Sequence, residues 1–133
     1  MTYDEHLVGR ADIERIERFG EAELDHLPLG AIRLDKEGKI LSYNQTEAHL
    51  AGRKKENVVG KSFFTEVAPC ANVQAFAGKF REGVQKGSLY TVFPYVFDYE
   101  MEPRHVWVTL FYSNETDTAW VFVRDDRRIN RMD

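Results

Sequence analysis

The sequence predicts an α+β fold with one five-stranded antiparallel sheet, helices on one face of it and an N-terminal helical cap on the other. Three observations predict this class. Strand-like alternation occurs twice within residues 30–43 and three times within residues 89–124, the segments between have helical spacing, and the last strands carry large apolar side chains on both faces. A chain of 133 residues with 43% hydrophobic side chains is long enough to bury such a core as one domain.

Composition excludes several classes of protein. The single cysteine, Cys70, cannot form an internal disulfide, and no apolar run approaches the length of a membrane span. The acidic start differs from a secretory signal, so we expect a cytoplasmic protein without membrane contact. A net charge of −4 argues against nucleic acid as a partner. The histidines lack metal-ligand spacing: they are His6, His26, His49 and His105.

The N-terminal segment predicts two short helices. Asp12 is a suitable start for a helix over 12–19, whose apolar residues share one face, and a glycine ends it. A second helix over 21–26 ends before Pro28. Neither helix can bury its apolar face alone, so residues 1–28 are expected to form a cap on the sheet.

A hairpin and a capped helix follow. Strands over 30–34 and 39–43 flank a turn of charged residues and glycine. Asn44 then caps a helix that runs through Leu50, and Glu47, three residues after the cap, fits a capping box.

The middle of the chain predicts further helices around a loop. Short helical segments are expected at 56–59 and 63–67. Cys70 follows Pro69 in a loop whose backbone is held but not helical. After the loop, an apolar residue recurs at every fourth position over 76–84, on a helix that ends at a glycine.

Three strands complete the sheet, over 89–99, 104–112 and 119–124. Pro94 cannot donate a ladder hydrogen bond, so the first of these strands is expected at the edge of the sheet or with a bulge. The second strand places three aliphatic residues on one face: Val106, Val108 and Leu110.

The expected organisation is therefore a cap at 1–28, a core with a ligand pocket at 29–125 and a solvated tail at 126–133. The order of elements resembles that of PAS domains, which sense rather than catalyse. Residues 30–124 further resemble the photoactive yellow protein family of blue-light sensors, which carry p-coumaric acid (4-hydroxycinnamic acid) as a thioester on a cysteine. The shared segments are Gly30-Ala31-Ile32, Tyr43-Asn44, Glu47, Gly52-Arg53, Val59-Gly60-Lys61, Phe63-Phe64, Val67-Ala68-Pro69-Cys70, Gly78-Lys79-Phe80, Phe97-Asp98-Tyr99, Met101 and Trp120-Val121-Phe122-Val123.

The resemblance implies a photoreceptor, not an enzyme, with p-coumaric acid bound covalently to Cys70. It implies that Tyr43 and Glu47 bind the phenolate oxygen of this chromophore and that Arg53 shields the pocket. Further residues are implied around the site: Ile32 and Phe97 as walls, Tyr99 and Met101 on a flanking loop. The chain departs from the family at the pocket position Ala51, where a threonine is common. This departure bears on colour and recovery rate, not on chromophore binding.

The chemistry of a buried phenolate explains these residue types. A free phenol titrates near pH ~10 and burial raises its pKa further, so a phenolate needs strong O–H donors such as Tyr43 and a protonated Glu47. Burial away from other charges would keep Glu47 neutral. Light would turn the chromophore's double bond from trans to cis, and Glu47 would then release its proton and become a buried carboxylate without a partner. Loosening of the N-terminal cap is the expected output.

Other interpretations stay open when the residues are taken without the resemblance. Cys70 would be a small buried hydrophobic residue, Glu47 a capping-box residue, Tyr43 a strand-end tyrosine and Arg53 a helix-end cation. Alternative functions are a PAS module that binds flavin or haem, or a thiol enzyme with Cys70 as nucleophile and His49 as base. The downstream signalling protein is unknown, and a monomer or weak dimer is expected.

Overall fold

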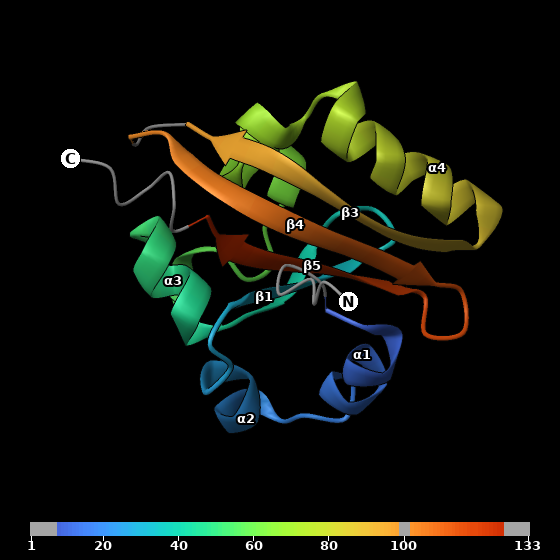
Figure 1. Cartoon of the computed structure of the whole chain (residues 1–133), viewed down its shortest axis with the longest axis horizontal. Helices are drawn as coiled ribbons and strands as arrows, with labels where there is room; N and C mark the ends of the chain where they lie inside the picture. Colours follow the sequence, from blue (N-terminus) through green and yellow to red (C-terminus); the bar gives the residue numbers. More distant parts are fainter. Residues whose placement is uncertain (1–7, 99–101, 127–133) are drawn as a thin grey trace, which may run out of the picture.

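A computed structural model describes residues 8–98 and 102–126 of the chain. Its centre is a five-stranded sheet in the order β2-β1-β5-β4-β3, in which each neighbouring pair is antiparallel (Figure 1). The strands are β1 (Gly30–Asp35), β2 (Ile40–Tyr43), β3 (Ser88–Phe97), β4 (Arg104–Ser113) and β5 (Thr118–Asp125). These positions confirm the predicted sheet.

Helices cover both faces of the sheet (Figure 1). The α-helices are α1 (Arg10–Ile16), α2 (Glu21–Asp25), α3 (Gln45–Ala51) and α4 (Lys79–Lys86), and the shorter turns are η1 (Lys55–Asn57), η2 (Phe63–Val67), η3 (Pro69–Ala71) and η4 (Gln74–Gly78). α1 and α2 lie on one face, and α4 lies with η2 and η4 on the other, as predicted. Within the described ranges no helix is long and apolar enough to cross a membrane.

Each face of the sheet has its own hydrophobic cluster, and β5 contributes to both because its side chains alternate. Val121 and Val123 lie in the main cluster, together with Phe76 and the other buried residues of η2, η4 and α4. Trp120 and Phe122 lie in the cap cluster, where their rings stack 5.3 Å apart. The cap supplies four further members of that cluster, Val8, Ile13, Ile16 and Leu24, and the others are Leu29 and Ala31. Full burial of each large apolar side chain contributes about 1.5–3 kcal/mol to the free energy of folding. The packing of this cluster is therefore the main interaction that holds the cap on the sheet.

The first helix starts two residues earlier than the sequence predicted. α1 begins at Arg10, after Gly9 in extended backbone. Asp12 lies at the third helical position, where its carboxylate accepts a hydrogen bond from the Gly9 N–H at 3.2 Å. An aspartate is favourable both as the capping residue before a helix and at the third helical position. The sequence pattern alone therefore could not distinguish the two, and it placed the helix start at Asp12. Phe19 follows the helix and packs, partly buried, against the cap cluster.

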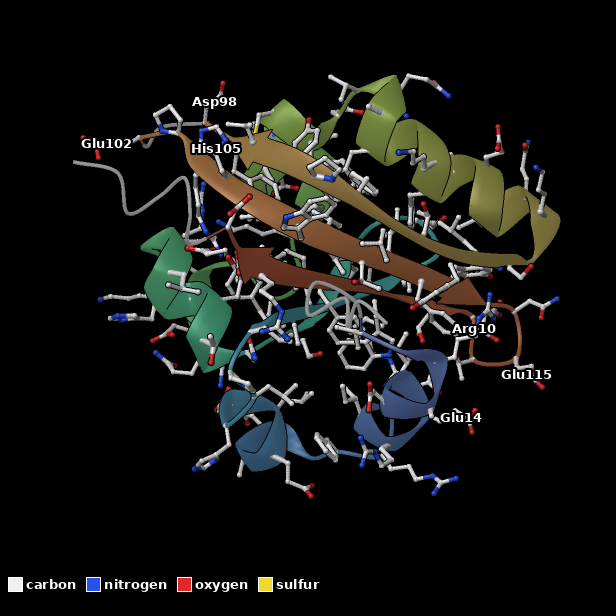
Figure 2. All side chains as sticks on the ribbon, viewed as in Figure 1. Arg10, Glu14, Asp98, Glu102, His105 and Glu115 are labelled. Atoms are coloured by element: carbon white, nitrogen blue, oxygen red, sulfur yellow. The ribbon has the colours of Figure 1, made fainter. Side chains whose placement is uncertain are left out.

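β3 is an edge strand, as Pro94 predicted. Pro94 stands opposite Trp107 of β4 in the ladder. Asp98 and Glu102 lie with His105 at one end of the sheet, far from the end where α1 lies (Figure 2).

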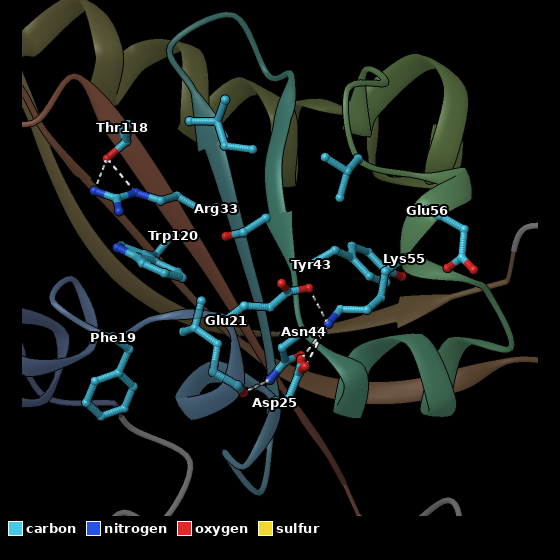
Figure 3. A pocket seen from close by; sticks show the side chains of 14 residues that line it. Phe19, Glu21, Asp25, Arg33, Tyr43, Asn44, Lys55, Glu56, Thr118 and Trp120 are labelled. Atoms are coloured by element: carbon cyan, nitrogen blue, oxygen red, sulfur yellow. Dashed lines mark hydrogen bonds and ion pairs between the residues drawn. The ribbon is translucent and has the colours of Figure 1, made fainter.

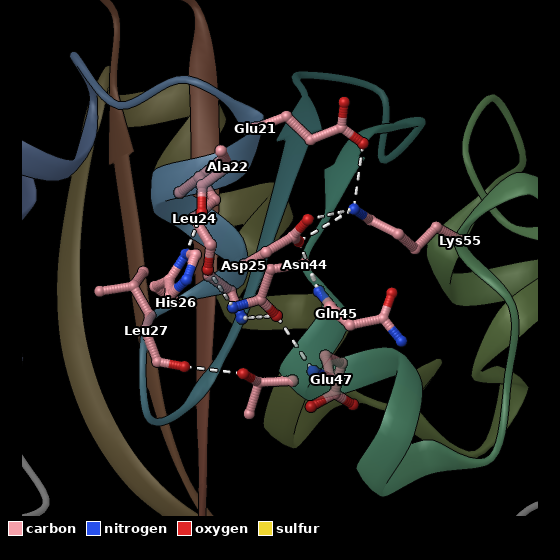
Figure 4. Close-up of polar contacts among 12 residues, drawn as sticks. Glu21, Ala22, Leu24, Asp25, His26, Leu27, Asn44, Gln45, Glu47 and Lys55 are labelled. Atoms are coloured by element: carbon pink, nitrogen blue, oxygen red, sulfur yellow. Dashed lines mark hydrogen bonds and ion pairs between the residues drawn. The ribbon is translucent and has the colours of Figure 1, made fainter.

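Asn44 joins the cap to the first turn of α3 (Figure 4). Its Nδ2 donates to the carbonyls of Leu24 and Leu29 at 2.8 and 3.0 Å. Its Oδ1 accepts hydrogen bonds from the N–H groups of Ala31 and Glu47 at 2.9 and 3.0 Å. One buried side chain therefore holds the end of the cap, the start of β1 and the N-terminus of α3.

Lys55, on η1, forms a second link to the cap (Figure 4). Its Nζ lies 3.0 Å from Glu21 Oε2 and 2.7 Å from Asp25 Oδ2, and Asp25 also accepts a hydrogen bond from the Gln45 N–H at 2.7 Å. Burial raises the pKa of Asp25, but the bonds from Lys55 and Gln45 outweigh it, so the net pKa lies below its usual value. The stability that this link supplies is therefore present at neutral pH and is lost as the pH falls through that lowered pKa.

Replacing Lys55 with glutamine should loosen α2 without unfolding the domain. Partly exposed ion pairs contribute about 0.2–1 kcal/mol, so hydrogen exchange of the α2 amides should become faster by at most about fivefold. Lys54→Gln, which removes the neighbouring exposed lysine, is the control. Equal exchange rates in the two variants would show that Lys55 does not hold the cap.

Candidate functional site

Glu47 is a buried carboxylate in the first turn of α3, with 4% of its surface exposed. Its N–H donates to the capping side chain of Asn44, but the capping-box interpretation is wrong for the carboxylate. The Asn44 N–H already donates to the Ala31 carbonyl at 3.0 Å. The carboxylate accepts two hydrogen bonds from Arg104 instead, Nη1 to Oε2 at 2.9 Å and Nη2 to Oε1 at 3.0 Å.

Gly30 makes room for this carboxylate. It opens β1 and stands opposite Val123 of β5. A Cβ atom added at Gly30 would overlap Oε1 of Glu47 and lie 3.1 Å from the Cβ of Glu47. The glycine is thus required by the close approach of α3 to β1, a reason that the strand pattern did not contain.

Arg104 is the charged partner that the sequence did not predict. It begins β4, is 7% exposed, and its Nε donates to Asp125 Oδ1 on β5 at 2.8 Å. The prediction that Glu47 is buried is confirmed, whereas the prediction that it lies away from other charges is wrong. The alternation of β4 could have indicated that Arg104 is buried. Arg104 stands two residues before Val106 and so shares its inward face.

Glu47 and Arg104 are buried and Asp125 is half-buried, so these three groups act strongly on one another. Burial raises the pKa of Glu47, Arg104 lowers it and Asp125 raises it, and the net pKa lies above its usual value. Burial lowers the pKa of Arg104, but its two carboxylate partners outweigh burial, so the guanidinium stays charged.

Tyr43 and Arg53 belong to the same electrostatic group. Tyr43 ends β2 and is 4% exposed. Burial and the charge of Glu47 raise its pKa, Arg53 and Arg104 lower it, and the net pKa is raised, so its side chain is a neutral O–H. Arg53 Nη2 donates to the Val67 carbonyl at 2.9 Å and ties the end of α3 to η2. The structure thus brings Tyr43, Glu47 and Arg53 together, and their roles toward a chromophore stay predictions.

Cys70 lies on the short 3₁₀ turn η3, not in the non-helical loop that the sequence predicted. Ala68, before Pro69, has φ −134° and ψ 66°, outside the helical region as predicted. The Cys70 side chain is half-buried and packs against the main cluster. The Tyr95 hydroxyl donates to the Cys70 carbonyl at 2.6 Å and so fixes the turn.

The predicted wall residues Ile32 and Phe97 are buried in the main cluster, and Tyr95 packs against it. The rings of Tyr95 and Phe97 are 5.6 Å apart. The sequence pattern indicated no role for Tyr95, because only the fold brings it to Cys70, 25 residues away in the chain. Ala51 is the half-buried last residue of α3. Tyr99 and Met101 lie outside the described residues, so their placement stays a prediction.

A cavity of about 770 Å³ lies between the cap and the hairpin of β1 and β2 (Figure 3). Tyr43 and Lys55 are among the residues that line it, whereas Cys70 and Glu47 are not. The Arg33 guanidinium lies 5.0 Å from the centre of the Trp120 ring beside this cavity. The cavity is therefore a feature of the cap side and not the predicted chromophore pocket.

Comparison with known proteins matches residues 24–125 to the PAS fold family. The photoactive yellow protein of Rhodothalassium salexigens is 45% identical over 117 residues, which are 87% of this chain and 94% of that protein. The photoactive yellow protein of Halochromatium salexigens is 44% identical with the same coverage. The photoactive yellow protein domain from the sensor histidine kinase Ppr of Rhodospirillum centenum has a TM-score of 0.79 and 47% identity, covering 84% of this chain and 97% of that domain.

The five-stranded antiparallel sheet and the family match over residues 24–125 define a PAS-fold sensor. Sequence identity above 40% to photoactive yellow proteins, over most of the chain, then identifies the family of sensors. The chain belongs to the photoactive yellow protein family, and it is a blue-light photoreceptor, not an enzyme.

Proposed function

We propose that this photoreceptor carries p-coumaric acid as a thioester on Cys70 Sγ. The observation that supports this most is the position of the only cysteine in the chain, half-buried against the cluster that contains Tyr43, Ile32 and Phe97. A thiol in this position adjoins the core yet remains accessible to an incoming acyl donor.

The polar residues of the site fit a phenolate at the far end of that group. Tyr43 is a neutral O–H donor, and a protonated Glu47 offers a second one. Arg53 and Arg104 add positive charge beside Tyr43, which favours an anionic oxygen over a neutral phenol. The chemistry that the bound group supplies is absorption of blue light and a trans-to-cis rotation that withdraws the phenolate from these donors.

Glu47 holds the proton that is exchanged. Burial raises its pKa, which favours a carboxyl that is protonated in the dark and gives up the proton when the acceptor's proton affinity rises. The change reaches the cap through Asn44, which binds the Glu47 N–H as well as the carbonyls of Leu24 and Leu29. A loosened α3 turn weakens the hold on the cap, and a downstream signalling protein reads the altered surface.

The remaining properties that we propose are less specific. The relative that is a domain of a sensor histidine kinase supports a signalling partner. The net charge of −4 argues against nucleic acid as a partner. We propose a cytoplasmic protein without membrane contact, and we expect a monomer or weak dimer. The division into 1–28, 29–125 and 126–133 stays a prediction.

Reconstitution of the full chain with activated p-coumaric acid tests the proposed function. We expect the intact mass to rise by one thioester-linked group and a visible band to appear, to bleach under blue light and to recover in the dark. Absence of both the adduct and the band would overturn the proposal and leave a PAS-fold sensor for another ligand.

Replacing Glu47 with glutamine should shift the absorption band to longer wavelength and block proton release. An amide N–H is a weaker donor than a carboxyl O–H, so more negative charge stays on the phenolate, and the amide has no proton to give. Absorption and infrared difference spectra measure the two effects. Glu56→Gln, at an exposed position on η1, is the control. A Glu47 variant with an unaltered photocycle would exclude Glu47 as the proton donor.

A further inference from the structure

The proposed photochemistry gives Arg104 only a general role, as positive charge beside Tyr43, although it is a buried cation that binds Glu47 directly. Its guanidinium lies between the carboxylates of Glu47 on α3 and Asp125 on β5. We propose that Arg104 is a positioning residue that holds the Glu47 carboxylate in its ionised form after proton release and so stabilises the light-activated state. This inference rests on the proposed function, because it concerns the proton that Glu47 gives up there.

The hydrogen bonds show which form of Glu47 the arginine binds. Nη1 and Nη2 of Arg104 each donate to a different oxygen of Glu47, at 2.9 and 3.0 Å. Arginine has donors only, so a protonated carboxyl would turn its O–H toward an N–H and lose one of these bonds. The paired arrangement is that of an ionised Glu47, so the contact in this structure is the one that we expect after proton release and not the one in the proposed dark state.

Asp125 allows the same arginine to serve when Glu47 is neutral. Arg104 Nε donates to Asp125 Oδ1 at 2.8 Å and leaves both Nη atoms for Glu47. The charged and titratable groups that face Glu47 are Tyr43 from β2, Arg104 from β4 and Asp125 from β5. When Glu47 is protonated, Arg104 and Asp125 balance each other, and when it is ionised, Arg104 is shared by two carboxylates. Arg104 thus has an anionic partner in both states.

This arrangement changes the energetics that the sequence predicted. The sequence predicted that proton release would leave a buried carboxylate without a partner, which costs several kcal/mol. Arg104 supplies that partner. An activated state with this ion pair should also last longer than one without it.

Titration of Glu47 in the full chain, before chromophore attachment, tests the inference. The infrared carbonyl band of protonated Glu47 is followed against pH and assigned by its loss in Glu47→Gln. Arg104→Gln should move the Glu47 midpoint to higher pH, because a favourable charge is lost. Asp125→Asn should move it to lower pH, because an unfavourable charge is lost. Arg104→Lys keeps the positive charge but cannot form two parallel hydrogen bonds with the carboxylate. Its Glu47 midpoint should therefore lie between those of the wild type and Arg104→Gln.

Arg33→Gln is the matched control, since Arg33 lies in the same sheet but donates to Thr118 Oγ1. If Arg104→Gln does not fold, the Glu47 midpoints of Arg104→Lys and Asp125→Asn test the inference. A general loss of structure cannot produce shifts of opposite sign. A Glu47 midpoint that is unchanged in the folded variants, or that moves in the same direction when Arg104 and Asp125 are neutralised, overturns the inference.

The reconstituted protein separates this inference from the proposed function. With the chromophore attached, Arg104→Gln should accelerate dark recovery on the order of tenfold, the effect of one pKa unit of interaction. If the wild type forms no adduct, the proposed function fails and the light-dependent role of Arg104 fails with it. If the adduct forms but the variant recovers at the wild-type rate, the inference alone fails.

Discussion

The Cys70→Ala variant should fold normally and contain no pigment. The side chain of Cys70 holds the only thiol of the chain, so no other atom can form a thioester. Free p-coumaric acid is a small ligand whose noncovalent contacts would not survive dialysis. The turn itself should persist, because the Tyr95 hydroxyl binds the Cys70 backbone carbonyl, which alanine retains.

Absorption and intact mass after reconstitution measure this loss. The wild type should gain one p-coumaroyl group and a visible band, and the variant should gain neither. Circular dichroism and a thermal melt compare the two folds. The same band and the same added mass in Cys70→Ala would place the attachment at another atom and remove Cys70 from the site.

Gly30→Ala should destabilise the domain by about 1–3 kcal/mol, the usual cost of an extra methyl group in a packed interior. The new Cβ would overlap Oε1 of Glu47, so the carboxylate would have to leave its position beside Arg104. Alanine is otherwise acceptable in a strand, so the cost arises at this contact. Urea denaturation of the full chain measures it as a lower midpoint with an unchanged slope.

The same substitution in a Glu47→Ala background is the control, because this background lacks the carboxylate that the new Cβ would overlap. There, Gly30→Ala should cost clearly less than in the wild type, so that the two changes are not additive. Additive costs would locate the strain elsewhere. Wild-type stability of the single variant would contradict the close approach of α3 to β1.

The strands could be predicted because their signal is periodic and extends over many residues. The alternation of β5 reappears in the structure as Val121 on one face and Trp120 on the other. Helix boundaries were less predictable, since Asp12 suits two positions in a first turn. The 3₁₀ turn that contains Cys70 is three residues long, which is too short to produce a period.

The site was predictable to a different extent for each residue. Tyr43, Glu47, Arg53 and Cys70 lie in segments shared with a known family, which identify residues but not their contacts. Arg104 is 57 residues from Glu47, and the two meet only because β4 pairs with β5 and α3 packs on β1. A pair so distant in the chain leaves no local pattern except an arginine on the inward face of a strand.

The separation of the two hydrophobic clusters determines how the dark state is rebuilt. Trp120 and Phe122 stand on β5, whose opposite face is packed in the main cluster, so these rings keep their positions when the cap departs. α1 and α2, with seven and five residues, are too short to be stable helices in isolation. In the proposed photocycle they would therefore refold on a surface that already has its final shape. We expect dark recovery to be templated docking, an intramolecular form of coupled folding and binding that does not require a new search for the whole fold.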